Sequence, residues 1–169
     1  GEVGAGRGRY TVPLARRVGS AGKIYSNDID ENSLSTIRRR CEQNGISNVE
    51  TILGEEDDPL LPKQALDMVI MVWVFHHLDQ PAPLLKNLKP SLKLGAPLVI
   101  VGPKDSEIDL EKEAFGAKVE PGRPTLRERI ESAASEAGFE LKLIRVESFL
   151  PGDDIYILKA TETTQNTTE

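Results

Sequence analysis

The sequence has little that could crosslink it, coordinate a metal or anchor it in a membrane. Cys41 is its one cysteine, which excludes an intrachain disulfide and a multi-cysteine metal site. His76 and His77 are its only histidines, and no third metal ligand is evident beside them. It contains no apolar run of membrane-spanning length and no visible signal peptide. We therefore expect no metal site, no membrane partner and, since one cysteine fits a reducing compartment, a cytoplasmic location.

Basic residues are also in the minority. Lys and Arg number 21 against 27 Asp and Glu, so the formal net charge is −6. This balance argues against a phosphate-binding surface over the whole molecule, and we expect no nucleic-acid partner. The run from Arg38 to Arg40 is interpreted as a solvated helix face. The sequence leaves the oligomeric state open.

The apolar pattern predicts strands that alternate with helices. We predict strands over 23–27, 48–53, 66–75, 97–102, 139–149 and 154–160, and helices over 10–19, 31–44, 83–92 and 124–138. Alternating elements of this kind give an α/β fold with a parallel sheet. The last two strands are joined by the turn "LPGD" and should pair antiparallel. Residues 102–124 are polar and charged, which predicts a long loop or short lid elements.

A glycine-rich turn lies at the start of the sequence. The stretch "EVGAGRG" places Gly4, Gly6 and Gly8 just before a predicted helix. Glycines let the backbone approach a ligand closely, and the free N–H groups of a helix N-terminus attract an anion. The dinucleotide fingerprint G-x-G-x-x-G would need a glycine where Arg9 stands. A nicotinamide-dependent oxidoreductase is therefore disfavoured.

Acidic residues follow the next two predicted strands. Asp28 lies 20 residues after Gly8, where a carboxylate can accept two hydrogen bonds from a ribose diol. Glu55 and Glu56 come just past the following strand, where a carboxylate can accept a hydrogen bond from the exocyclic amine of adenine. Each acid alone is typical of a solvated surface, but three at successive strand ends indicate a nucleoside site.

These stretches together resemble class I S-adenosylmethionine-dependent methyltransferases. "EVGAGRGRYTVPLA" is similar to the family's first motif, "YSNDID" to its second-strand acid and "LGEEDDPLLP" to its third-strand loop, where Asp is commoner than Glu. Residues 66–101 resemble the family's fourth strand through its fifth. The usual "LKPGG" sequence is "LKLGAP" here, and we expect a turn to form at this place nonetheless. The resemblance implies a Rossmann-like three-layer sandwich, mostly parallel, with a C-terminal antiparallel strand.

The family's first strand precedes the glycine loop, and this sequence has no residues for it. We therefore expect an N-terminally incomplete methyltransferase domain over 1–160, with a gap between the second and fourth strands. The polar residues 161–169 are expected to form a disordered tail.

The resemblance also implies the cofactor, S-adenosylmethionine, with S-adenosylhomocysteine as product, and the residues that bind it. The residues that would hold its methionine end are Glu2, Gly4, Ala5, Gly6 and Gly8. Asp28 would bind the ribose with Ile29 beside the adenine, and Glu55 and Glu56 would flank the adenine edge. Val72 and Trp73 would line the pocket near the reactive methyl group, although Trp73 fits the core equally well.

The methyl acceptor is less clearly indicated. Aligning an activated methyl group with a nucleophile needs no obligatory catalytic residue, and none is assigned here. "VWVF" after the fourth strand disfavours amino-directed enzymes on adenine or glutamine, and Cys41 stands in the wrong place for cytosine C5 chemistry. We expect a small-molecule acceptor, with a protein or RNA acceptor second. A non-catalytic cofactor-binding protein or complex subunit is the alternative.

Five further side chains are ambiguous. A structural role is favoured for His76 and His77 over that of a general base, because adjacent residues point to different faces. Lys104, Phe115 and Arg123 are candidates for substrate contacts, although a solvated loop is the simpler interpretation of that segment.

Overall fold

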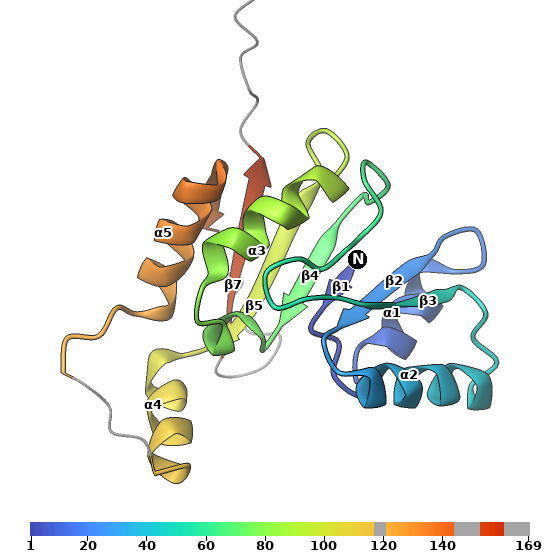
Figure 1. Cartoon of the computed structure of the whole chain (residues 1–169), viewed down its shortest axis with the longest axis horizontal. Coiled ribbons are helices and arrows are strands. Elements are labelled where there is room, and N and C mark those ends of the chain that lie inside the picture. Colours follow the sequence, from blue (N-terminus) through green and yellow to red (C-terminus); the bar gives the residue numbers. More distant parts are fainter. Residues whose placement is uncertain (117–120, 144–152, 161–169) are drawn as a thin grey trace, which may run out of the picture.

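One sheet organises the chain in the computed structural model, which describes residues 1–116, 121–143 and 153–160 (Figure 1). Within those residues the sheet has seven strands, β1 Glu2–Val3, β2 Ile24–Asp28, β3 Val49–Leu53, β4 Val69–Val72, β5 Pro97–Pro103, β6 Phe139–Leu143 and β7 Asp153–Ala160. Their order is β3-β2-β1-β4-β5-β7-β6, with β1 to β5 parallel and β7 antiparallel to both neighbours. The predicted sheet is confirmed.

Helices cover both faces of this sheet. They are α1 Thr11–Val18, α2 Glu31–Gln43, α3 Pro81–Leu88, α4 Asp105–Ala114 and α5 Leu126–Ala137, with short 3₁₀ turns η1 Phe75–His77 and η2 Lys89–Ser91. A small core that includes Val12, Leu34 and Ile37 lies under α1 and α2. Helices α3 and α5 pack side by side over a larger core on the other face (Figure 1). The predicted three layers are therefore present.

Local sequence signals account for the helix ends. Asp30 caps α2 by accepting hydrogen bonds from the backbone N–H groups of Asn32 and Ser33. Thr125 caps α5 in a reciprocal capping box with Glu128. Such caps satisfy backbone donors that have no partner inside the helix, which explains why these two boundaries are readable from the sequence.

The start of the chain contributes a short first strand, and the expectation of an N-terminally incomplete domain stays a prediction. Strand β1 contains only Glu2 and Val3, yet it holds the central position between β2 and β4. Glu2 pairs with Ser26 on one side and with Ile70 on the other. Within the described residues, β1 occupies the expected gap between β2 and β4 near their carboxyl ends.

The predicted long loop over 102–124 is also wrong in part, because α4 occupies ten of its residues. The sequence "DSEIDLEKEA" is mostly charged and lacks the repeating apolar stripe that predicts a helix. Ile108 is buried, and the Asp105 carboxylate accepts a hydrogen bond from the Leu126 N–H at 2.8 Å. Tertiary contacts to the start of α5 thus support a helix that its own sequence pattern does not indicate.

The C-terminal half contains the predicted antiparallel pair, β6 and β7. Residues 144–152, which include most of the predicted connecting turn, and the predicted tail over 161–169 lie outside the described residues. The "LKLGAP" turn survives as expected. Gly95 has φ +75°, and the Ala96 N–H donates to the Lys93 carbonyl at 3.0 Å.

A buried carboxylate joins β1 to β2 and α1. Glu2 is only 3% exposed, and its Oε2 accepts hydrogen bonds from Thr11 Oγ1 at 2.5 Å and from Ser26 Oγ at 3.0 Å. Burial raises the pKa of Glu2, and the hydrogen bonds from Thr11 and Ser26 lower it in part. The carboxylate has hydroxyl donors in place of bulk water, which limits the cost of burying it.

Replacing Glu2 with glutamine should therefore change how stability depends on pH. A carboxyl group whose pKa is higher in the folded chain contributes stability below its unfolded pKa and loses it as the pH rises. The pKa of Glu2 lies above its usual 4.5. Relative to Glu2→Gln, the wild type should lose unfolding free energy as the pH rises above 4.5, as measured by urea unfolding.

Glu50→Gln is the control for this comparison. The Glu50 side chain is half-exposed beside Lys23 on the outer strands, so its replacement should leave the pH profile of stability close to that of the wild type. Parallel profiles for the wild type and Glu2→Gln would contradict the prediction.

Candidate functional site

The carboxyl ends of the parallel strands open onto two adjoining spaces. We call the larger, of about 780 Å³, the large cleft and the smaller, of about 230 Å³, the small hollow. Val3, Gly4 and Trp73 line both, so the two spaces meet where β1 and β4 end. The chain order reverses between these two strands, which is where ligands bind in open α/β sheets.

The glycine loop forms the floor of this junction. Gly4, Gly6 and Gly8 have φ values of +67°, +53° and +74°, which glycine adopts without strain. A Cβ on Gly4 would lie 2.5 Å from Val74 Cγ2, so a side chain does not fit there. A Cβ on Gly6 would meet nothing within 4 Å and would project into open space at the small hollow.

The other members of the loop divide between the site and the core. Ala5 lines the small hollow, and its N–H donates to the Asn27 carbonyl at 2.9 Å. Gly8 lines neither space, and a Cβ on it would lie 2.9 Å from Ile37 Cγ1 on α2. The structure therefore brings Gly4, Ala5 and Gly6 together at the site, whereas Gly8 allows α2 to pack against the loop.

Asp28 connects the glycine loop to the large cleft. Its Oδ2 accepts a hydrogen bond from the Gly6 N–H at 2.7 Å, and its Oδ1 accepts one from the Asp30 N–H at 3.0 Å. These bonds fix the carboxylate at the end of β2, where it lines the cleft. Ile29 lines the cleft beside it and is 59% exposed. Two carboxylate oxygens held in this way retain lone pairs for hydroxyl donors of a ligand.

The loop after β3 supplies the far wall of the large cleft. Glu55 and Glu56 line it, as predicted from their position after the strand. The loop is shaped by Asn27, whose Nδ2 donates to the Ile52 carbonyl at 3.3 Å and to the Pro59 carbonyl at 3.0 Å. The sequence did not predict this role of Asn27, because hydrogen bonds from one side-chain amide to two distant carbonyls follow no sequence motif.

Charge divides the site into two parts. The charged side chains among the described residues of the large cleft are acids apart from His77, namely Asp28, Glu55, Glu56, Asp57 and Asp79. The small hollow is lined instead by Arg7 and Arg9, with the buried Glu2 beneath. An acidic cleft favours hydroxyl and amine donors and repels a pyrophosphate, whereas the arginines favour a carboxylate.

Trp73 forms the wall that separates the two spaces. It has φ +58°, a left-handed conformation that is rare for a bulky residue, and its N–H donates to the Val101 carbonyl at 2.8 Å. The side chain is 46% exposed, so Trp73 belongs to the site and not to the core. Val72 lines the small hollow immediately before it. Strained residues of this kind concentrate at functional sites.

Glu2 lies at the base of the small hollow. Its carboxylate is engaged by Thr11 and Ser26, so it supports the glycine loop from below. Arg7, Arg9 and Tyr10 complete this hollow and were not predicted as ligand-binding residues. The signal was present in the loop itself, since two arginines there place positive charge beside the glycines.

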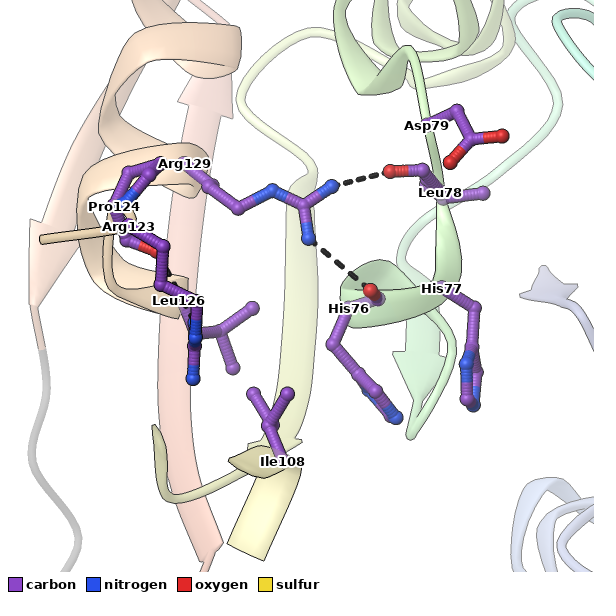
Figure 2. Close-up of a pocket in the computed structure, with 9 residues that line it drawn as sticks. All are labelled: His76, His77, Leu78, Asp79, Ile108, Arg123, Pro124, Leu126 and Arg129. Atoms are coloured by element: carbon purple, nitrogen blue, oxygen red, sulfur yellow. Dashed lines mark hydrogen bonds between the residues drawn. The ribbon is translucent and has the colours of Figure 1, made fainter. Parts of the chain in front are cut away.

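A third space, the side cavity, lies against the large cleft and was not predicted. It encloses about 420 Å³, and His77, Leu78 and Asp79 line both spaces. Its other walls come from His76 and from α4 and the start of α5 (Figure 2). Of the predicted substrate contacts, Arg123 lines this cavity. Lys104 and Phe115 are exposed and line none of the three spaces.

The described residues contain neither a metal-binding cluster nor a membrane-spanning helix. Across the described residues, no group of three or more His, Cys, Asp or Glu side chains is arranged to hold a metal ion. None of the helices in this part of the chain is long and apolar enough to cross a membrane.

Relatives of known name match parts of the chain. Aklanonic acid methyltransferase DauC of Streptomyces sp. (strain C5) is 28% identical over 69 residues, which cover 41% of this chain and 31% of that protein. Protein-L-isoaspartate O-methyltransferase of Pyrococcus horikoshii is 32% identical over 97 residues, which cover 57% of this chain and 42% of that protein. The chain thus spans less than half the length of these relatives.

Similarity to solved structures extends over almost the whole chain. A SAM-dependent methyltransferase from Aquifex aeolicus superimposes with a TM-score of 0.72 at 25% identity, covering 93% of this chain and 79% of that one. A SAM-dependent methyltransferase from Methanosarcina mazei gives 0.67 at 14% identity, covering 95% and 92%, which shows the shared fold alone.

The family described as "Methyltransferase domain" matches residues 2–95, more than half of the chain. This match covers the glycine loop, Asp28, the loop after β3 and the β4 edge with Trp73, which are the parts that build the two spaces. The chain belongs to the class I S-adenosylmethionine-dependent methyltransferase family.

Proposed function

We propose that the chain binds S-adenosylmethionine across the large cleft and the small hollow and transfers its methyl group to a small molecule. The observation that carries this proposal is the division of charge at the Gly4–Trp73 junction, with carboxylates on one side and arginines on the other. S-adenosylmethionine has hydroxyl and amine donors at its nucleoside end and an α-carboxylate beside an α-ammonium at its methionine end. The nucleoside donors therefore suit the acidic cleft, and the α-carboxylate suits the arginines of the small hollow.

Individual residues receive roles from their positions. Asp28 accepts hydrogen bonds from the ribose hydroxyls, since its carboxylate is already fixed by the Gly6 and Asp30 amides. Glu55 and Glu56 flank the adenine edge, with Ile29 against its face. In the small hollow the Gly4–Gly6 backbone and Arg9 receive the methionine end, and Val72 and Trp73 enclose the sulfonium centre. When bound, the cofactor supplies a methyl group that is already activated for transfer.

A small-molecule acceptor is supported by the side cavity and by one relative. The cavity of about 420 Å³ has the size of a small-ligand pocket and adjoins the large cleft. Aklanonic acid methyltransferase DauC is named for a small-molecule acceptor. Protein-L-isoaspartate O-methyltransferase is named for a protein acceptor, which keeps that class as the second candidate. The single cysteine supports the cytoplasm as the proposed location.

Calorimetry with S-adenosylhomocysteine tests the cofactor site directly. The Asp28→Ala variant should bind about 100-fold more weakly, because it loses charge-assisted hydrogen bonds to the ribose. Asp67→Ala is the control, since Asp67 is an exposed acid paired with Lys93 before the start of β4. Absence of binding by the wild-type chain would refute the proposed function. Binding without methyl transfer to any compound of a metabolite extract would favour the non-catalytic alternative.

Two glycine variants separate a binding effect from a folding effect. Gly6 and Gly45 both have positive φ, and a Cβ on either would meet nothing within 4 Å, so alanine should cost similar stability at both positions. Only Gly6 lines the small hollow. Gly6→Ala should weaken S-adenosylhomocysteine binding at least about tenfold, because the methyl group occupies ligand space and strains the loop. Gly45→Ala should leave it unchanged, and equal affinities would place the methionine end elsewhere.

A further inference from the structure

The side cavity has two chemically different walls (Figure 2). The imidazole rings of His76 and His77 descend from η1 on one side, with their centroids 3.8 Å apart. Ile108 from α4 and Leu126 from α5 face them from the other side. Aromatic rings on one wall and branched aliphatic chains on the other favour a ring compound between them, and the charged side chains of the lining favour one that carries a polar group.

Polar contacts hold these walls at a fixed separation. Arg129 on α5 donates to the His76 carbonyl at 3.1 Å and also to the Leu78 carbonyl, which fastens the η1 turn to α5 (Figure 2). Arg123 pairs with Asp105 and Asp109 and so fastens α4 to the segment before α5. The cavity is therefore built by three separate elements that are tied together before any ligand enters.

Arg129 also gives the cavity its electrostatic character. The guanidinium of Arg123 is paired with carboxylates, but within the described residues Arg129 contacts only carbonyl oxygens. A partly buried cation without a paired anion stabilises negative charge that develops nearby. The cavity thus combines aromatic and aliphatic contacts with a site for an oxyanion.

His77 occupies the position where the side cavity meets the large cleft. Its side chain is exposed, whereas His76 is 8% exposed and packs within the turn. An imidazole at this junction can contact a group in the side cavity that faces the cofactor space, and it can pass a proton to solvent. Asp79 lines the same junction and suits a positively charged imidazole after proton transfer.

We propose that the side cavity is the acceptor pocket, that it takes a small ring compound with an acidic hydroxyl group, a phenol or an enol, and that His77 is the catalytic base. This inference rests on the proposed function. The acceptor O–H bond breaks and its proton goes to the His77 imidazole. The oxygen forms the new bond to the methyl carbon, and the carbon–sulfur bond of the donor breaks with its electron pair left on sulfur. The products are a methyl ether and S-adenosylhomocysteine, and His77 then releases the proton to water.

The first test locates the ligand without requiring turnover. The chain has only two histidines, so imidazole NMR signals of the chain saturated with S-adenosylhomocysteine report on this wall alone. Adding 2-naphthol should shift the signals of both His76 and His77. Ile108→Trp, which fills the cavity, should abolish the shifts, and Phe115→Trp, at an exposed position just past α4, should retain them.

Two results of this test would be adverse in different ways. Binding of S-adenosylhomocysteine without any 2-naphthol-induced shift in the wild type would overturn the acceptor pocket and leave the proposed function intact. Failure to bind S-adenosylhomocysteine would overturn the proposed function itself. The wild-type titration decides both points even if Ile108→Trp does not fold.

The second test separates the base from a structural role. With S-adenosylmethionine, the wild type should convert 2-naphthol to its methyl ether, and His77→Gln should lower kcat about 100-fold at similar KM. Methylation of 2-naphthalenethiol should fall less than about threefold in the same variant, because a thiol that ionises readily needs no base. An equal loss for both acceptors, or bound 2-naphthol that is never methylated, would overturn the assignment of His77.

Discussion

The hydrogen bonds that Glu2 accepts from Thr11 and Ser26 are the constraint on which the site depends. Glu2 belongs to β1 and Thr11 is the first residue of α1, so one carboxylate anchors both ends of the intervening glycine loop. Ser26 adds β2 to the same cluster. Ordering the left-handed glycines of this loop costs conformational entropy, which the hydrogen bonds at its two ends help to offset. The same cluster ties β1 to β2 and α1.

The same cluster positions the ligand-binding groups on either side of it. Ser26 lies two residues before Asp28, so fixing β2 also fixes the carboxylate that accepts the Gly6 N–H. The register of β1 with β4 in turn sets Trp73 beyond the end of β4, facing the loop. Acidic groups then collect on the β2–β3 side of the junction and arginines on the loop side. The division of charge is thus a consequence of strand order combined with loop composition.

Much of this arrangement could be predicted, and the reason is that the signals are local. Asp28, Glu55 and Glu56 were readable because each follows a strand, and parallel strands end at a common edge. The positions of α2 and α5 were readable from the helical periodicity that predicts helices over 31–44 and 124–138. The left-handed conformation of Trp73 could not be predicted, since a bulky residue rarely adopts it. Helix α4 was missed because it depends on contacts with Leu126 and not on its own apolar pattern. The β1 strand was missed because two residues carry no periodicity.

The side cavity shows where local prediction stops. Its walls come from η1, α4 and α5, and the bonds that join them connect residues that lie between 14 positions apart, from Arg123 to Asp109, and 53 positions apart, from Arg129 to His76. Such long-range contacts leave no motif, whereas the proposed cofactor site is assembled from motifs at strand ends.

The two halves of the proposed site also respond differently to sequence change. A substitution in the glycine loop disturbs a backbone that every ligand contact shares, but α4 and α5 can vary in apolar content while Arg129 still fastens η1. The proposed acceptor pocket can therefore change its ligand without rebuilding the proposed cofactor site, which is why the motifs predict the cofactor but not the acceptor.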